Sequence, residues 1–393
     1  MSLTLPEPDE FEQAHSQRLQ TRVVETIERA GGVVSFQQYM QMALYEPGLG
    51  YYVAGAQKFG ETGDFITAPE ISPLFSRCLA RQCAEVLQQL PTVACILELG
   101  AGSGVMATDI LLELERLETL PDHYYILELS SELAARQRQT LQQYAPHLLG
   151  SVRWLTTLDG LELHGVILAN EVLDAMPVRC FTAYGDGVVE RGVAVRDGAL
   201  VWREYPADAS LLQRVLTIRE DLPAAWSDSY RSEFNPQLGS WVSLLSRHLS
   251  QGVVLLSDYG YPRSDYYHPQ RSEGTLLGHY RQRATEDPFL YPGLQDLTAS
   301  VDFTAVAEAG VDAGLELAGY TTQAYFLMGS QLEQVYQQAL HGSDERRRLA
   351  LSHQVKLLTL PAEMGERFQV MGFSRGIDAP LQGFLLQDFS CKL

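Results

Sequence analysis

A buried-strand pattern followed by closely spaced glycines, at residues 93–104, constrains the fold of this chain more than any other stretch. Residues 93–99 are apolar except for one glutamate, and three glycines follow at alternate positions. Such a run is typical of a buried parallel strand, and glycines directly after it allow a tight turn and the close approach of a ligand. A helical pattern begins at Val105, and the start of a helix offers unpaired N–H groups. The pattern therefore predicts a nucleotide-like ligand at the end of this strand.

The spacing of the glycines separates the classes of ligand. A dinucleotide loop reads G-x-G-x-x-G, and its third glycine would stand where this chain has Val105. With the preceding acid the loop reads E-x-G-x-G-x-G, the form found in S-adenosyl-L-methionine (SAM) methyltransferases. A glycine turn in an unrelated α/β domain and a nicotinamide dehydrogenase are the alternatives. The cofactor-binding residues predicted from this loop are Glu98, Gly100, Gly102, Ser103 and Gly104.

Polar residues follow three further predicted strands, at residues 122–128, 152–155 and 164–169. Ligands of open α/β sheets bind outside the carboxyl ends of the strands. An acid after the second strand binds ribose hydroxyls in both NAD and SAM sites, and an acid after the third can meet an adenine amino group. Together these positions favour SAM over a nicotinamide cofactor. The residues concerned are Glu128, Asp159 and Asn170 for the cofactor, with Glu171 and Asp174 where a substrate would meet it.

The chain is expected to form an α/β fold with a doubly wound sheet. Turn signals at 185–187 and 197–198 predict an antiparallel insert, and a fifth buried strand at 253–260 resumes the sheet. Residues 261–302 form a long polar stretch, and long loops of this kind are commonly lids or binding segments. The predicted domains are a helical extension with a cofactor-covering loop (1–91), the first part of the SAM-binding core (92–178), an inserted β/helical subdomain (179–250) and the second part of the core with a substrate loop at 261–302 (251–393).

Charge and composition limit the partners of the chain. Its net charge of −20 would repel a phosphate backbone, so no nucleic acid is expected, and a basic partner is favoured. It has no apolar run of about 18 residues, so no stable membrane insertion is expected. The acidic first ten residues resemble neither a signal peptide nor a transit peptide, and the five scattered cysteines suggest reduced thiols. These features predict a cytoplasmic location, and no spacing of Cys or His suggests a metal.

Two glycine- and aromatic-rich stretches, at 45–52 and 60–72, precede a well-signalled helix that starts at Ser72 and Pro73 and leads into the glycine-loop strand. We therefore expect the second stretch to fold over the cofactor. Its predicted cofactor contacts are Gly63, Asp64 and Thr67.

The glycine loop and five further motifs of this chain resemble the mitochondrial-dysfunction protein A family, which includes complex I assembly-factor arginine methyltransferases and their bacterial relatives. The five further motifs lie at 44–52, 63–72, 169–178, 258–260 and 296–303. The strings at 63–72 and 296–303 are specific to the family, and the glycine loop is not. The resemblance covers most of the chain. It implies a class I SAM-dependent methyltransferase fold, and an arginine of a respiratory complex I subunit as acceptor in the mitochondrial members.

The functional hypothesis is therefore SAM-dependent methylation of a protein arginine, on a complex I-type subunit by resemblance. A pair of carboxylates would hold the guanidinium, and Glu171 and Asp174 are the candidates. Asp258 is a third predicted catalytic residue, and Glu233 is a further helper. A small-molecule methyltransferase and a non-catalytic SAM-binding assembly chaperone are the alternatives. Homodimer formation is left open.

Overall fold

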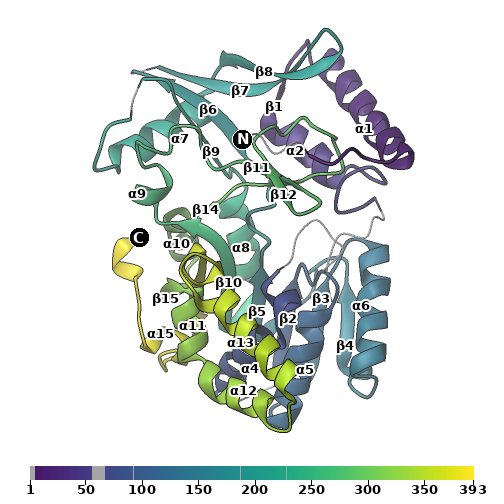
Figure 1. Ribbon diagram of the computed structural model, residues 1–393. Helices are drawn as coiled ribbons and strands as arrows, with labels where there is room; N and C mark the ends of the chain where they lie inside the picture. Colours follow the sequence, from purple (N-terminus) through teal and green to yellow (C-terminus); the bar gives the residue numbers. More distant parts are fainter. Residues whose placement is uncertain (1–4, 55–66, 92, 186, 227) are drawn as a thin grey trace. The chain divides into compact units, whose positions relative to one another are not determined.

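The computed structural model describes residues 5–54, 67–91, 93–185, 187–226 and 228–393 (Figure 1). The chain divides into two compact units. Unit 1 comprises Met1–Phe65, Leu173–Leu238 and Tyr261–Thr304, and unit 2 comprises Ile66–Val172, Gly239–Gly260 and Ala305–Leu393. The sequence had grouped 261–302 with the second part of the core, whereas the contacts of this segment group it with the N-terminal helices and the insert.

Unit 2 is built on a sheet with the strand order β15-β16-β10-β5-β2-β3-β4. The five neighbouring strands β10, β5, β2, β3 and β4 are parallel to one another. Strand β16 is antiparallel to both β10 and β15. Strands and helices alternate along the chain, so the predicted doubly wound α/β fold is confirmed. The strands are β2 (Cys95–Leu99), β3 (His123–Leu127), β4 (Val152–Leu155), β5 (Leu163–Asn170), β10 (Leu249–Tyr261), β15 (Glu316–Thr322) and β16 (Phe368–Arg375).

The order of the strands fixes where a ligand can bind in unit 2. The chain passes from β2 to β3 and β4, and then returns to the other side of β2 with β5. Open α/β sheets bind ligands at such a reversal, beyond the carboxyl ends of the two strands. The glycine loop follows β2 directly, and Glu171 follows β5. All five residues of β2 are buried, as expected for a strand covered on both faces.

Helices flank the strands of unit 2 along the chain (Figure 1). One of the two 15-residue helices is α4, whose N-cap Ser72 accepts a hydrogen bond from the N–H of Leu74. Its apolar face packs against α5 and α12. The helices are α3 (Ala68–Ile71), α4 (Pro73–Leu87), α5 (Val105–Arg116), α6 (Ser131–Tyr144), α8 (Leu238–His248), α10 (Phe303–Asp312), α11 (Gln323–Gly329), α12 (Leu332–Leu340), α13 (Glu345–Thr359), α14 (Met364–Arg367) and α15 (Gln382–Leu385), with short 3-10 turns η1 (Leu149–Ser151) and η2 (Ser390–Lys392).

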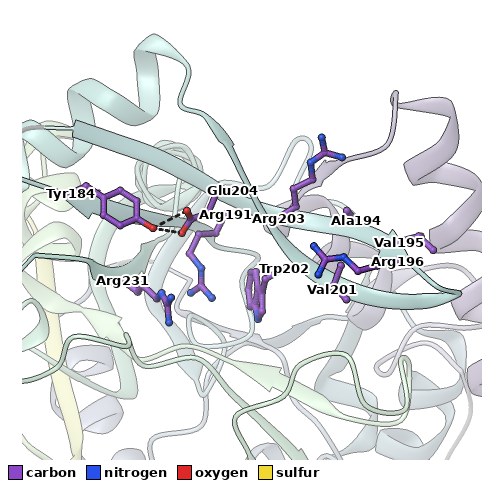
Figure 2. A pocket seen from close by; sticks show the side chains of 10 residues that line it. All are labelled: Tyr184, Arg191, Ala194, Val195, Arg196, Val201, Trp202, Arg203, Glu204 and Arg231. Atoms are coloured by element: carbon purple, nitrogen blue, oxygen red, sulfur yellow. Dashed lines mark hydrogen bonds between the residues drawn. The ribbon is translucent and has the colours of Figure 1, made fainter.

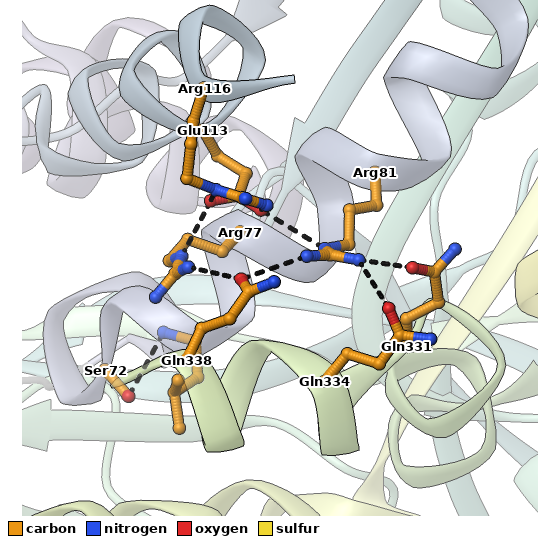
Figure 3. Close-up of polar contacts among 9 residues, drawn as sticks. Ser72, Arg77, Arg81, Glu113, Arg116, Gln331, Gln334 and Gln338 are labelled. Carbon is orange, nitrogen blue, oxygen red and sulfur yellow. Dashed lines mark hydrogen bonds and ion pairs between the residues drawn. The ribbon is translucent and has the colours of Figure 1, made fainter. Parts of the chain in front are cut away.

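A buried carboxylate links α4 to α5 (Figure 3). Glu113, whose side chain is 2% exposed, accepts hydrogen bonds from Arg77, Arg81 and Arg116. Arg81 and Arg77 also donate to Gln338 of α12, each at 3.1 Å. A buried charge is stable only when it is paired, so this cluster holds three helices in one arrangement.

Unit 1 contains an antiparallel sheet in the order β1-β7-β6-β9, with β8 paired to β7. The β6–β7 and β7–β8 hairpins confirm the antiparallel insert predicted from the turn signals. The strands are β1 (Val34–Ser35), β6 (Arg179–Tyr184), β7 (Gly187–Arg196), β8 (Ala199–Pro206) and β9 (Tyr230–Phe234), and the helices are α1 (Glu10–Arg29), α2 (Phe36–Tyr45), α7 (Ala209–Glu220) and α9 (Arg263–Tyr266).

The segment 261–302 is more regular than the sequence predicted. Besides α9 it contains β11 (Leu277–Tyr280), β12 (Arg283–Thr285), β13 (Asp296–Thr298) and β14 (Val301–Asp302), and the first three form a small antiparallel sheet. Buried tyrosines tie it to the N-terminal part of unit 1. The Tyr39 hydroxyl donates to the Pro288 carbonyl at 2.6 Å, and the Tyr52 hydroxyl donates to Asp296 at 2.8 Å. These contacts are distant in sequence, so local periodicity could not predict them.

Candidate functional site

The glycine loop has the backbone that its sequence requires. Gly100, Gly102 and Gly104 have φ values of 67°, 51° and 83°, in the left-handed region that favours glycine. A Cβ atom at Gly104 would lie 2.9 Å from the Cα of Gln137 in α6, and one at Gly100 would lie 2.8 Å from a methyl carbon of Val172. The loop thus packs tightly beneath the start of α5, whose N-cap is Gly104 and lacks a capping side chain.

Ser103 connects the loop to the short helix α3. Its hydroxyl donates to a carboxylate oxygen of Glu70, and its carbonyl accepts from the Thr140 hydroxyl at 2.7 Å. Thr67, the N-cap of α3, makes no side-chain capping bond. Gly63 and Asp64 lie outside the described residues.

Glu128 belongs to a network that the sequence did not reveal. It accepts from the N–H of Ser130 at 2.8 Å and from the side-chain amide of Gln137 at 2.9 Å. The same amide donates to the carbonyl of Gly102, and its oxygen accepts from the indole of Trp154. Gln137 therefore joins the ends of β3 and β4 to the glycine loop. A glutamine on the buried face of an amphipathic helix belongs to no motif, and only its contacts identify it.

Asp159, the acid predicted to meet adenine, is exposed after β4, and its N–H donates to the Thr157 hydroxyl at 3.1 Å. Solvent access leaves its carboxylate available to a ligand. Its role stays a prediction.

Glu98 is fully buried in β2, where the Tyr124 hydroxyl donates to Oε2 at 2.8 Å. Burial raises the pKa of Glu98 to about 7, with the Tyr124 hydrogen bond acting to lower it and Glu128 acting to raise it. Its Oε1 atom is buried and has no hydrogen-bond partner within the part of the chain that the structure describes. Buried polar atoms normally have a partner, so this oxygen is suited to a bound polar group.

The end of β5 carries the second half of the site. The Asn170 amide donates to Glu171 Oε1 at 3.1 Å, and the N–H of Ala68 donates to the same oxygen at 3.3 Å. Glu171 has a φ of 53°, an uncommon conformation for a residue other than glycine. The Asn170 Oδ1 atom is buried and lacks a hydrogen-bond partner among the described residues.

Asp258, which is 1% exposed near the end of β10, holds the backbone beside Glu171. Its Oδ2 accepts from the backbone N–H of Val172 at 3.2 Å, and its Oδ1 accepts from the backbone N–H of the next residue, Tyr259, at 2.9 Å. The N–H of Glu171 donates to the Ser257 carbonyl at 2.9 Å. Asp258 is therefore built to position the segment after β5.

Two of the predicted acids belong to unit 1. Asp174 is buried, and its carbonyl accepts from the N–H of Ala299 at 3.0 Å. Glu233 is buried and accepts from the Thr275 N–H at 2.8 Å and from the Tyr266 hydroxyl at 3.0 Å. Those bonds anchor the 261–302 segment, so Glu233 has a structural task within unit 1.

The residues of unit 2 fit a nucleoside-type cofactor. The glycine loop and Glu171 follow the two strands at which the sheet order reverses. Two buried oxygens, Glu98 Oε1 and Asn170 Oδ1, lack partners among the residues that the structure describes. In the described ranges no helix is long and apolar enough to cross a membrane, and no three His, Cys, Asp or Glu residues are grouped as a metal site would need.

Solved structures support this fit. A crystal structure from Burkholderia thailandensis, of a protein proposed to be a methyl transferase and bound to S-adenosyl-homocysteine, is 44% identical. The similarity covers 99% of this chain and 100% of that chain, with a TM-score of 0.94. A second Burkholderia thailandensis crystal structure is 42% identical over 99% of this chain and 100% of that chain, with a TM-score of 0.91.

Curated relatives align over most of the chain. The mitochondrial protein arginine methyltransferase NDUFAF7 of Danio rerio is 29% identical, over 86% of this chain and 83% of its own length. Its Drosophila melanogaster homologue is 29% identical, over 90% and 85%, and the Homo sapiens protein is 28% identical, over 86% and 80%. Because these relatives are named as mitochondrial proteins, the prediction of a cytoplasmic location is wrong.

The model of one protein family matches residues 78–321, and its description reads "Putative S-adenosyl-L-methionine-dependent methyltransferase". The match spans the glycine loop, the polar ends of β3 to β5 and the insert. It removes the dehydrogenase alternative and agrees with the cofactor predicted from the glycine spacing. The chain belongs to this family of SAM-dependent methyltransferases, and the resemblance to the mitochondrial-dysfunction protein A family is confirmed.

Proposed function

We propose that this methyltransferase transfers a methyl group from SAM to an arginine side chain of a protein. Its curated relatives are named protein arginine methyltransferases, and they align with more than four-fifths of the chain. The net charge of −20 favours a basic substrate segment. By resemblance, a subunit of a complex I-type respiratory assembly is the proposed partner.

The observation that carries this proposal is the way Glu171 is held. Its Oε1 accepts from Asn170 and from the backbone of Ala68, and its φ of 53° fixes the direction in which the side chain leaves the backbone. A guanidinium offers five N–H donors in a planar fork that matches a carboxylate. Glu171 holds the arginine and stabilises the charge that remains on it during the reaction.

Asp174, three residues further along the chain, is proposed as the second carboxylate for the guanidinium. Asp258 acts differently, because both of its oxygens accept backbone N–H groups. We assign it the task of positioning Glu171, in place of direct contact with the substrate.

The cofactor supplies an electrophilic methyl group on a sulfonium sulfur. We propose that the loop of Gly100, Gly102 and Gly104 brings the backbone close to it, and that Glu128 holds the ribose hydroxyls. Asp159 is the proposed partner of the adenine amino group. The buried oxygens of Glu98 and Asn170 provide the remaining polar partners. Thr67, Ser103, Gly63 and Asp64 complete the proposed cofactor contacts.

Labelling with SAM that carries a tritiated methyl group tests the reaction and the acceptor together. The protein is incubated with a lysate of cells that lack it, and labelled bands are hydrolysed and analysed for methylarginine. We expect one or a few labelled proteins that yield methylarginine. The Glu171→Gln variant should label nothing, while its affinity for S-adenosyl-homocysteine in calorimetry stays unchanged.

Glu333→Gln, an exposed acid of α12, is the matched control and should label like the wild-type protein. Label found only in small molecules would contradict the protein substrate. Label in another amino acid would contradict the arginine acceptor, and absence of any label under these conditions would favour the non-catalytic chaperone. Full labelling by Glu171→Gln would remove that residue from the mechanism.

A further inference from the structure

A polar pocket lies within unit 1, on the antiparallel sheet. It has a volume of about 520 Å³, and Figure 2 shows the side chains around it. Four of the lining residues are arginines and one is an acid, Glu204, in a chain whose acids outnumber its Lys and Arg residues by 49 to 29. The arginines are Arg191, Arg196, Arg203 and Arg231. This excess of positive charge is local and is opposite to the charge of the whole protein.

The strand register places two of these arginines on the same face of the sheet. Arg191 of β7 lies opposite Glu204 of β8, and Arg231 of β9 lies opposite Thr182 of β6. Thr182 in turn lies opposite Val189, two residues from Arg191. Residues paired across strands, and residues two apart on one strand, project from the same face. Both guanidiniums therefore project from one side, as Figure 2 also shows.

The hydrogen bonds of Glu204, the acid in the pocket, go to two hydroxyl groups and not to Arg191. Glu204 accepts from the Thr182 hydroxyl at 2.8 Å and from the Tyr184 hydroxyl at 2.8 and 2.9 Å. Among the described residues, Arg191 has no ion pair, and its guanidinium carbon lies 4.2 Å from the centre of the Trp202 ring. Burial lowers the pKa of Arg191 from its ordinary value, and the nearby charges of Glu204 and Glu273, which act to raise that pKa, do not outweigh burial.

Arg231 is only partly satisfied. Its Nη1 donates to Glu273 at 2.9 Å, but Glu273 is exposed. Its Nε is buried and has no hydrogen-bond partner within the described part of the chain. A buried donor without a partner is uncommon and indicates a place where a ligand or ion would be stabilised.

We propose that this pocket binds a small organic anion, and that Arg191 and Arg231 hold its carboxylate or phosphate group. A guanidinium forms paired N–H···O bonds with either group. The volume is within the range of roughly 300–1,000 Å³ that is typical of small-molecule sites. The stacking of Arg191 on Trp202 fixes the guanidinium before the ligand arrives, which reduces the entropy lost on binding. The pocket belongs to unit 1, whereas the glycine loop belongs to unit 2.

Calorimetric titration of the full-length protein with inorganic pyrophosphate and with citrate tests the proposal, with S-adenosyl-homocysteine present at saturation. We expect one site per chain for at least one of the two anions, and the anion that binds more tightly identifies the preferred group. Arg191→Gln and Arg231→Gln should each weaken binding at least about tenfold, as the loss of a charge-assisted hydrogen bond predicts.

Arg153→Gln, an exposed arginine of β4, removes the same charge outside the pocket and should bind the anion like the wild-type protein. Unchanged binding of S-adenosyl-homocysteine by each variant shows that the variant is folded. The proposal is overturned if neither anion binds, or if Arg153→Gln weakens binding as much as Arg191→Gln does. It would also fail if both pocket variants bound the anion with wild-type affinity.

Discussion

The hydroxyl of Tyr124 in β3 donates a 2.8 Å hydrogen bond to Oε2 of Glu98 in the neighbouring strand β2, and both side chains are fully buried. Glu98 is the acid that precedes the glycine loop. Its buried position raises its pKa to about 7, so its charge changes near neutral pH. The stability of unit 2 should depend on pH through this residue.

The direction of that dependence follows from proton binding. In the folded protein the pKa of Glu98 is about 7, against an ordinary value of 4.5, so between these values the folded state binds more protons than the unfolded state. The contribution of Glu98 to stability is greatest below pH 4.5 and is lost as the pH rises to about 7. Because one pKa unit corresponds to about 1.4 kcal/mol, the loss is on the order of 3 kcal/mol.

Glu98→Gln removes this titration, so urea denaturation across the window from pH 4.5 to 7 should show a smaller decline in its free energy of unfolding than in that of the wild-type protein. Half-buried Asp109, whose pKa is raised to about 7 by its partial burial, keeps contributing a decline in both proteins. If the free energy of unfolding fell equally with pH in the two proteins, Glu98 would be neutral throughout the window or charged throughout it.

Asp258→Asn should slow methyl transfer without weakening cofactor binding. The substitution removes the charge that accepts the N–H groups of Val172 and Tyr259, and a hydrogen bond to a charged group is worth about 1.5–3 kcal/mol. We expect the labelling rate to fall about 10- to 100-fold as Glu171 loses its fixed position. Asp312→Asn, an exposed acid of α10, serves as the control. If the affinity of Asp258→Asn for S-adenosyl-homocysteine fell by the same factor as its labelling rate, Asp258 would belong to the cofactor site instead.

Gly104→Ala should destabilise the protein and weaken cofactor binding. The residue has a φ of 83°, and the new Cβ would lie 2.9 Å from the Cα of Gln137. Gly342→Ala is a matched control, because that glycine has a φ of 73° and a Cβ added to it would have no other atom within 4 Å. Conformational strain of about 1 kcal/mol is common to both, and the clash adds to it only at Gly104. Equal melting temperatures for the two variants would show that α6 moves away without cost.

Glu113→Gln should destabilise unit 2 by about 3 kcal/mol in denaturant titrations, since it leaves buried Arg81 without its carboxylate. Burial acts to raise the pKa of Glu113, but the hydrogen bond from Arg116 and the charge of Arg77 outweigh it and lower the pKa below its ordinary value of 4.5. The stabilisation is thus present above pH 4.5 and is lost as the pH falls further, opposite in sign to that of Glu98. A variant that keeps the wild-type acid sensitivity would contradict this account.

The sequence by itself determined the core of the fold and the class of cofactor. β2 is apolar apart from Glu98 and is buried at every position, and the spacing of Gly100, Gly102 and Gly104 needs a backbone that only glycine adopts easily. These are local constraints, because they act between residues that are neighbours in the chain. For the same reason the turn signals were sufficient to predict the β6–β7 and β7–β8 hairpins.

Tertiary structure decided which polar residues share a task. Gln137 joins Glu128 to the glycine loop, Asp258 holds the backbone after β5, and Glu233 anchors the 261–302 segment. Each of these roles depends on a hydrogen bond between residues far apart in sequence, which no periodicity records. The arginine pocket of unit 1 likewise exists only because the register of four strands brings Arg191 and Arg231 to one face.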